Sequence, residues 1–209
     1  MRKVLMGIYD KYVLPKILNM VMQTPDLTKL RAALVPMAKG RVLEIGIGSG
    51  LNLPFYDKQV KVTGVDPSLE LQVYARDLAR DHSIDVEFVT DTAEALASEN
   101  NFFDTAVVTW SLCTIPNAID TLLEVHRVLK PGGKLIFVEH GRAPDANVTR
   151  WQGRLNPAWR KITGGCNLNR EPDQSLIDTG FTIDHLDQGY LRGPRWATYT
   201  YRGIAQPNK

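Results

Sequence analysis

The chain has 209 residues, of which 44% are hydrophobic and 23% are charged, and its net charge is +2. This composition fits one globular unit and excludes a disordered, collagen-like or coiled-coil chain, while the near-neutral charge argues against a nucleic-acid partner. Two cysteines are too few for a disulfide framework and favour a reduced, cytoplasmic protein.

Neither a secretory signal nor an integral membrane span is expected. The longest uncharged run, residues 105–119, is interrupted by polar residues and a proline, and it is shorter than the roughly 20 apolar residues of a spanning helix. At the N-terminus, Asp10 ends the short apolar stretch that follows Arg2 and Lys3. Peripheral membrane contact and the oligomeric state stay open.

The first forty residues differ from the rest in their pattern. Apolar residues at helical spacing predict a helical segment over residues 4–22, which Thr24-Pro25-Asp26 ends. A second helix is expected from Leu27 to Met37. We therefore expect a helical lid over residues 1–40 and a main domain over residues 41–209.

From Arg41 onward, short β-branched runs alternate with helical stretches. Strands are expected at residues 41–45, 61–66, 86–89, 105–109 and 134–139, and helices at residues 69–80 and 118–129. Strands separated by helices predict a doubly wound α/β fold with a mainly parallel sheet. Residues 181–186 and 197–204 form two further strands without a crossover helix, so they are expected to pair antiparallel at the edge of a seven-stranded sheet.

The first expected strand leads into a loop with glycines at alternate positions, Gly46, Gly48 and Gly50, preceded by Glu44. Such glycines allow a sharp turn and a close approach to a ligand at the carboxyl end of the strand. A tight turn that binds nothing is the alternative. The spacing differs from the dinucleotide fingerprint, and an acid would repel a pyrophosphate. The ammonium and sulfonium groups of S-adenosylmethionine suit this acid better.

Asp66 ends the second expected strand. A carboxylate at this place can accept both hydroxyls of a ribose. The alternative is a helix N-cap before Pro67 and Ser68, a role that is compatible with ribose binding.

Together, residues 42–50 and Val65-Asp66 resemble the first two motifs of class I S-adenosylmethionine-dependent methyltransferases. Residues 91–94 follow the third strand, where that family contacts adenine, and either Asp91 or Thr92 takes the position of its acid. The resemblance covers residues 41 to about 140 and implies a Rossmann-like fold with S-adenosylmethionine as cofactor. It implies a cofactor-binding set of Glu44, Gly46, Gly48, Gly50, Asn52, Asp66, Pro67, Asp91, Thr92, Ala93, Ser111 and Leu112.

Four segments at the acceptor side resemble a narrower group, the microsomal alkyl-thiol S-methyltransferases of animals and their bacterial relatives. The segments are residues 110–115, 138–141, 156–159 and 164–171, in the same order. This resemblance implies a small-molecule acceptor, a thiol. The animal enzymes carry a hydrophobic N-terminal anchor, whereas residues 4–22 are mixed in character.

His140 is the catalytic candidate because it ends the fifth expected strand. A thiol must lose its proton before it attacks, and an imidazole is suited to accept that proton. The alternative is a structural histidine beside Glu139, which is itself expected to orient a neighbouring group rather than react.

Cys113, Trp159, Asn167 and Arg170 are the candidates for contact with the acceptor. Methyl transfer needs no protein nucleophile. The alternative for Cys113 and Cys166 is therefore that they are buried apolar side chains without a role in the reaction. The distance between them in sequence does not indicate a metal site, and no metal is expected.

Other functions remain as alternatives. A lipid or quinone acceptor, methylated on nitrogen or carbon, would suit an N-terminal segment that touches a bilayer. A domain that binds S-adenosylmethionine as a sensor or scaffold is a non-enzymatic alternative. The glycine spacing and Glu44 argue against a nicotinamide oxidoreductase.

The sequence also contains a basic cluster, formed by Arg150, Arg154, Arg160 and Lys161. This cluster fits an anionic partner or a solvated helix face equally well.

Overall fold

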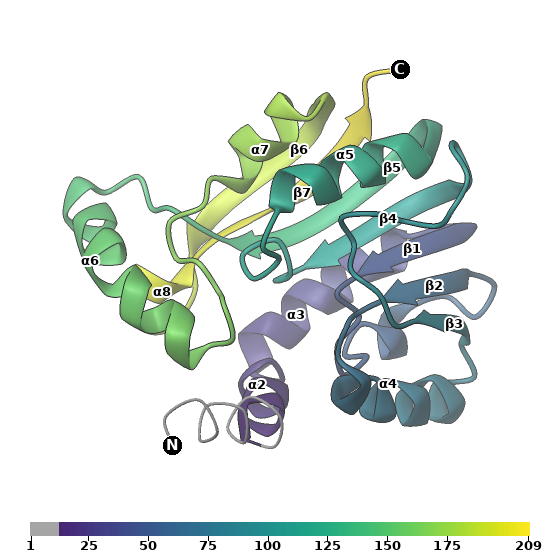
Figure 1. The fold of residues 1–209 in the computed structure, drawn as a ribbon, viewed down its shortest axis with the longest axis horizontal. Coiled ribbons are helices and arrows are strands. Elements are labelled where there is room, and N and C mark those ends of the chain that lie inside the picture. The colour runs from purple at the N-terminus through teal and green to yellow at the C-terminus, as the bar shows by residue number, and fades with distance from the viewer. Residues whose placement is uncertain (1–12) are drawn as a thin grey trace.

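The computed structural model describes residues 13–209, so residues 4–12 of the helical segment expected over residues 4–22 lie outside the described chain. Its centre is a seven-stranded sheet in the order β3-β2-β1-β4-β5-β7-β6 (Figure 1). The strands are β1 (Arg41–Ile45), β2 (Lys61–Val65), β3 (Asp85–Val89), β4 (Phe103–Thr109), β5 (Leu129–His140), β6 (Phe181–Tyr190) and β7 (Tyr199–Pro207). The first five are parallel, and β7 runs antiparallel to both β5 and β6. The predicted fold class is confirmed.

Helices flank the sheet. They are α2 (Leu14–Val21), α3 (Pro25–Leu34), α4 (Leu69–His82), α5 (Ala118–Val128), α6 (Ala146–Ile162), α7 (Pro172–Asp178) and α8 (Arg195–Thr198), with short 3₁₀ turns η2 (Val35–Met37) and η3 (Leu53–Phe55). Pro25 begins α3 rather than preceding it, because proline is tolerated in the first turn of a helix. Helices α6, α7 and α8 were not delimited by the sequence pattern.

The two faces of the sheet bury alternate residues of each strand. Leu43 packs in one core cluster with Leu122 of α5, whereas Val42 packs in the other with Ala75 of α4. This alternation follows from the two-residue period of a strand, and the nearly continuous apolar character of the strands follows from burial on both faces. The sheet is therefore doubly wound, as the sequence predicts.

Strand β5 begins earlier than expected. Leu129 already pairs with Phe103 of β4, and the register shifts before Lys134 pairs with Thr105. The Pro131-Gly132-Gly133 turn thus forms an irregularity within the strand instead of a separate loop.

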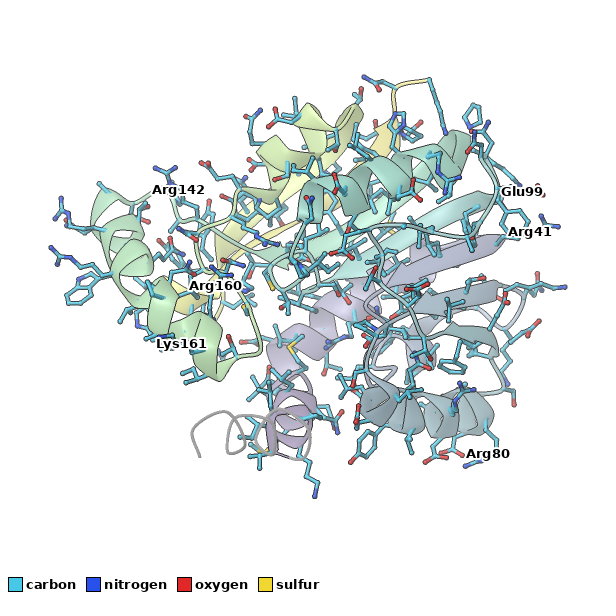
Figure 2. All side chains as sticks on the ribbon, viewed as in Figure 1. Arg41, Arg80, Glu99, Arg142, Arg160 and Lys161 are labelled. Atoms are coloured by element: carbon cyan, nitrogen blue, oxygen red, sulfur yellow. The ribbon has the colours of Figure 1, made fainter. Side chains whose placement is uncertain are left out.

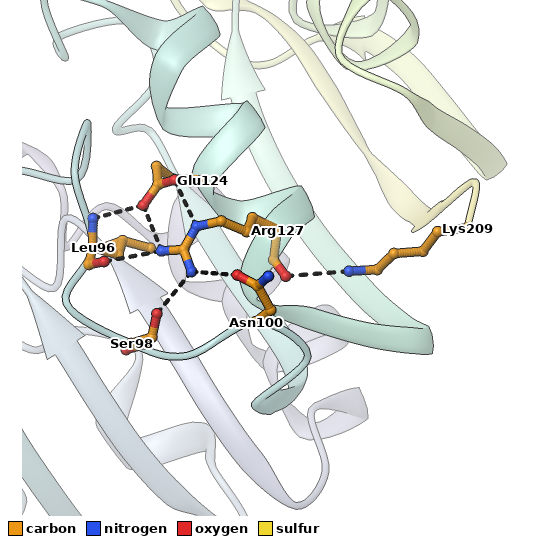
Figure 3. A network of polar contacts seen from close by, with 6 residues as sticks. All are labelled: Leu96, Ser98, Asn100, Glu124, Arg127 and Lys209. Atoms are coloured by element: carbon orange, nitrogen blue, oxygen red, sulfur yellow. Dashed lines mark hydrogen bonds and ion pairs between the residues drawn. The ribbon is translucent and has the colours of Figure 1, made fainter.

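Arg127 near the end of α5 fixes the long connection between β3 and β4 (Figure 3). Its guanidinium donates to both carboxylate oxygens of Glu124, at 2.8 and 2.7 Å, and to the carbonyl oxygens of Leu96 and Ser98. Asn100 accepts a further hydrogen bond at 2.8 Å through its side-chain oxygen. This planar fork of donors reaches five acceptor atoms and so ties the connection to α5 at the end of the sheet where β4 begins.

Additional helices lie at the carboxyl end of the parallel strands. Figure 1 shows α2, α3 and α6 beyond the end at which β4 and β5 finish. On α6, Arg160 and Lys161 come from the last turn (Figure 2). Ligands of open α/β sheets bind at this carboxyl edge, which makes it the place to look for a functional site.

We expect Gly50→Ala to destabilise the fold more than Gly132→Ala. Both glycines have positive φ, +79° and +75°, but a Cβ at Gly50 would lie 2.7 Å from the Cα of Ala75, whereas one at Gly132 meets nothing within 4 Å. Both variants strain the backbone because alanine disfavours positive φ. Overpacking against Ala75 should lower the free energy of unfolding of Gly50→Ala by roughly a further 1–3 kcal/mol. Urea unfolding of the two variants measures the difference; equal losses would contradict the close packing of the glycine loop on α4.

Candidate functional site

The glycine loop after β1 is held by the neighbouring strand and its acid. Gly46 N–H donates to the carbonyl oxygen of Val65 at 2.8 Å, and Gly48 N–H donates to Asp66 Oδ2 at 2.9 Å. A Cβ on Gly46 would overlap the Ser111 hydroxyl, so the loop after β4 lies directly against it. The structure therefore brings the predicted glycine loop, Asp66 and Ser111 together.

Asp66 is 8% exposed at the end of β2. Its Oδ1 atom accepts a hydrogen bond from Ser68 N–H at 2.8 Å, and Ser68 in turn caps α4 by accepting from Leu71 N–H. The N-cap role considered for Asp66 thus falls to Ser68. Burial raises the pKa of Asp66, against the hydrogen bonds from Ser68 and Gly48. Each carboxylate oxygen has capacity for a further hydrogen bond from a ligand hydroxyl.

Glu44 is buried beneath the glycine loop. Its oxygens accept hydrogen bonds from Asn52 Nδ2 at 2.9 Å and from the Tyr56 hydroxyl at 2.8 Å. Burial raises the pKa of Glu44 to about 7, although the two hydrogen bonds and the charge of Arg31 lower it. Among the described residues, nothing bonds to the buried Oδ1 atom of Asn52. This orphaned acceptor beside a carboxylate is suited to a cationic ligand group.

Arg31 of α3 is a site residue that the sequence analysis missed. It is 4% exposed, its guanidinium lies 4.8 Å from the centre of the Trp110 ring, and Nη1 donates to the carbonyl of Met22 at 2.7 Å. Burial lowers its pKa to about 10, with the charge of Glu44 acting in the opposite direction. One arginine on a charged helix carries no local signal of this position; the tertiary fold alone creates it.

The predicted adenine contacts after β3 divide between surface and core. Asp91 and Thr92 are exposed, whereas Ala93 is buried in the core cluster that includes Val65. Pro67, the predicted cofactor contact after β2, is also exposed. Asp91 Oδ1 accepts a hydrogen bond from Thr92 N–H at 2.7 Å. Both candidates for the adenine acid therefore remain at the surface.

Glu139 organises the loop that follows β4. The carboxylate of this fully buried residue accepts hydrogen bonds from the backbone N–H groups of Ser111 at 2.7 Å, Leu112 at 2.9 Å and Cys113 at 3.3 Å. Just before them, Trp110 adopts a positive φ of 51°, a conformation that bulky residues rarely adopt without tertiary support. Glu139 therefore orients its neighbours, as the sequence analysis expected.

His140, at the end of β5, lies among two sulfur atoms and an indole. The Nε2 atom of His140 is 2.9 Å from Cys166 Sγ, which is 3.6 Å from Cys113 Sγ. Trp159 Nε1 donates to Cys166 Sγ at 3.4 Å. The two sulfurs and one histidine nitrogen all lie within 4.8 Å of one another, a set of soft donors that also suits a thiophilic metal ion. The spacing in sequence gave no sign of this cluster.

Charge within the cluster is distributed unequally. Hydrogen bonding with Cys113, then with His140 and Trp159, lowers the pKa of Cys166 to about 4 in spite of burial. Hydrogen bonding with Cys166, together with burial, raises the pKa of Cys113. Burial lowers the pKa of His140, but its contact with Cys166 and the charge of Glu139 outweigh burial, so the net shift is upward. These shifts favour a thiolate at Cys166.

Asn167 and Arg170 join the same loops. Asn167 donates to the carbonyl of Cys113 through both its backbone N–H, at 2.8 Å, and its side chain, at 2.9 Å. The Arg170 guanidinium donates to the carbonyls of Leu112 and Ile115. These contacts make both residues positioning groups for the loop after β4, which carries Cys113.

Comparison with known proteins adds to this geometry. Residues 43–137 match the family described as a methyltransferase domain. A solved S-adenosylmethionine-dependent methyltransferase of Methanosarcina mazei superposes with a TM-score of 0.61 at 27% identity, covering 81% of this chain and 93% of that one. The chain therefore contains a methyltransferase domain, and its fold is similar to that of a solved S-adenosylmethionine-dependent methyltransferase.

Two curated relatives are similar to this chain over more than half of its length. Thiol S-methyltransferase TMT1B of Rattus norvegicus is 37% identical over 150 residues, which cover 70% of this chain and 62% of that protein. Phosphatidylethanolamine N-methyltransferase of Cereibacter sphaeroides is 36% identical over 113 residues, which cover 52% of this chain and 55% of that protein. The alignments therefore span less than two thirds of these relatives. Within residues 13–209, no helix has the length and hydropathy needed to cross a membrane.

We expect Glu44→Gln to change how stability depends on pH. The pKa of Glu44 rises from 4.5 to about 7 in the folded protein. Between these values the native state binds more protons than the unfolded state, so the contribution of Glu44 to stability falls as pH rises. The variant cannot ionise, and its stability relative to wild type should rise by on the order of 1–3 kcal/mol across this window.

Urea unfolding at several pH values measures this effect. The exposed Glu70→Gln variant is the control. A constant offset between Glu44→Gln and wild type at every pH would contradict the raised pKa of Glu44.

Proposed function

We propose that this methyltransferase transfers the methyl group of S-adenosylmethionine to a small thiol. Similarity to a relative named as a thiol S-methyltransferase carries the acceptor assignment. The position of His140 supports it, because this imidazole lies at the carboxyl edge of the sheet, among the sulfur atoms of Cys113 and Cys166. A sulfur nucleophile therefore has a base and a polarisable environment within reach.

Groups of opposite charge suit the two ends of the cofactor's amino acid. The orphaned Asn52 oxygen and the Glu44 carboxylate would bind the ammonium group, and the buried Arg31 guanidinium would bind the carboxylate. Asp66, fixed by two backbone N–H groups, would accept the ribose hydroxyls. Asp91 or Thr92 would contact the adenine.

When bound, S-adenosylmethionine supplies an electrophilic methyl group on a sulfonium. The chain's own task is to position the acceptor and to remove its proton. His140 Nδ1 is buried and has no hydrogen-bond partner among the described residues, so it is the nitrogen proposed to accept that proton. The neighbouring Glu139 charge stabilises the imidazolium that results.

The helices before β1 are proposed to act as a lid, with residues 1–40 as one segment and residues 41–209 as the catalytic domain. Arg31 stacks on Trp110, and the buried Leu14 lies against Gly164 in the segment that carries Cys166. Covering the carboxyl edge in this way would exclude water from the reacting groups.

A lipid acceptor is the second candidate, suggested by the relative named as a phosphatidylethanolamine N-methyltransferase. The exposed apolar side chains of Ile17, Met20 and Val21 on α2 suit contact with a bilayer surface. Label transfer from radiolabelled S-adenosylmethionine to thiols in lipid-free buffer separates the two candidates. Transfer to phospholipid or a quinone precursor instead would favour the second.

We expect Asp66→Ala to weaken binding of S-adenosylhomocysteine by about 1–3 kcal/mol, the usual cost of losing a charged hydrogen-bond acceptor. Isothermal calorimetry measures the affinity, and a thermal melt checks that the loop anchored by Asp66 stays folded. Asp77→Ala, which removes an exposed carboxylate on α4, is the matched control. Equal affinity of Asp66→Ala and wild type would reject the ribose assignment.

We expect His140→Ala to lower kcat/KM for a small thiol by roughly 10²–10⁴-fold near neutral pH, the usual contribution of a general base. The wild-type kcat/KM should rise with pH as His140 loses its proton. Because the pKa of His140 is raised, this rise should lie above pH 6.5, the ordinary pKa of an imidazole. The defect should shrink at high pH, where a free thiol with a pKa of about 8.5 ionises without a base. The measurement is the pH profile of kcat/KM for both proteins.

The exposed His82→Ala variant is the control and should follow the wild-type profile. A defect of the same size at every pH would assign His140 a positioning role. Failure of wild type to methylate any thiol would reject the proposed acceptor.

A further inference from the structure

The two cysteines of the chain lie side by side although they are far apart in sequence. Their sulfur atoms are 3.6 Å apart. Asn167 holds them there, because it follows Cys166 directly and donates two hydrogen bonds to the Cys113 carbonyl. On the other side, Glu139 fixes the backbone N–H of Cys113. Both thiols are thus presented on a scaffold of backbone contacts that prevents their separation.

The two sulfurs differ in exposure and in their surroundings. Cys113 is buried, whereas Cys166 is half-buried. Three polar groups converge on Cys166 Sγ: the Cys113 thiol, His140 Nε2 and the Trp159 indole N–H. The indole N–H donates to this sulfur and the imidazole lies 2.9 Å from it, an environment that stabilises a thiolate at Cys166. Methyl transfer to a separate acceptor does not require this thiolate.

We propose that Cys113 and Cys166 form a redox-active dithiol that opens low-molecular-weight disulfides, with Cys166 as the attacking thiolate and Cys113 as the resolving thiol. This activity goes beyond methyl transfer and needs no S-adenosylmethionine. Its substrates are small organic disulfides able to reach the half-buried Cys166.

The reaction is balanced in two steps. Cys166 thiolate attacks one sulfur of the disulfide, the S–S bond of the substrate breaks, and one thiolate leaves while a mixed disulfide forms on Cys166. The Cys113 thiol then loses its proton and attacks Cys166 Sγ, which releases the second substrate thiol and forms the Cys113–Cys166 disulfide. The protein is oxidised by two electrons and the substrate is reduced; an external small thiol returns the protein to the dithiol by the same exchange.

The test uses the full chain, reduced, desalted and then mixed with the disulfide of mercaptoethanol in the absence of S-adenosylmethionine. We expect wild type to release two mercaptoethanol molecules per chain and to lose two hydrogen atoms in intact mass. Because the chain contains two cysteines only, the product is assigned without ambiguity. Omitting the cofactor separates this outcome from any failure of the proposed methyl transfer.

Two single variants identify the order of attack. Cys113→Ser should stop at the mixed disulfide, carry one mercaptoethanol group and release one thiol. Cys166→Ser should remain unmodified at neutral pH, because its remaining thiol is buried. His140→Ala should slow the first step by about tenfold at pH 7 and less at pH 9, since a cysteine with an ordinary pKa is only a few per cent ionised at neutral pH.

The wild-type measurement decides the proposal even where a variant fails to fold, which circular dichroism detects. Wild type that releases no thiol, or that stops at a stable mixed disulfide, would overturn the proposal. Faster modification of Cys166→Ser than of Cys113→Ser would overturn the assignment of the attacking group. A stoichiometric metal ion in the purified protein, measured by mass spectrometry and blocking the reaction until it is chelated, would replace the dithiol with a metal site.

Discussion

The carboxylate of Glu139 is the contact on which the loop after β4 depends. One buried acid accepts hydrogen bonds from three consecutive backbone N–H groups, those of residues 111–113. Without these bonds, three buried donors would lack a partner, and the loop after β4 would lose its conformation. Because Ser111 touches the glycine loop and Cys113 touches Cys166, this one group links the glycine loop to the cluster around Cys166.

Burial of ionisable groups is concentrated at the same edge of the sheet. Glu44 and Glu139 are both buried, and burial raises the pKa of each to about 7. Arg31 is buried nearby with a lowered pKa. Such groups oppose folding unless they are compensated, so their accumulation in one region is typical of a functional site rather than of a structural core.

The side chains that surround Cys166 come from segments that are remote in the chain. Cys113 follows β4, His140 ends β5, and Trp159 and Cys166 lie on or just after α6. The sheet and the loop after β4 provide the first two, whereas α6 and its following loop provide the others. The cluster therefore joins the doubly wound sheet to the segment between β5 and β6.

The sequence determined the periodic elements and the residues adjacent to them. Three local patterns carried the prediction: alternating strands and helices, the glycines at positions 46, 48 and 50, and an acid at the end of β2. The doubly wound sheet and the position of Asp66 beside the glycine loop could therefore be predicted. Glu139 was expected to orient a neighbouring group, but the three backbone N–H groups that it binds were not predicted. The start of β5 and the bounds of α6 were missed because a Pro-Gly-Gly turn and a polar helix have weak periodicity.

Only the tertiary structure decided which distant side chains meet. Arg31 reaches Trp110 because α3 packs across the end of the sheet, and Cys166 reaches Cys113 because Asn167 binds the loop after β4. Neither contact has a signature in sequence, since each depends on the path of the chain between elements rather than on spacing within one. Local hydrophobic periodicity therefore fixes the scaffold of this protein, whereas long-range packing fixes the environment of its sulfur atoms.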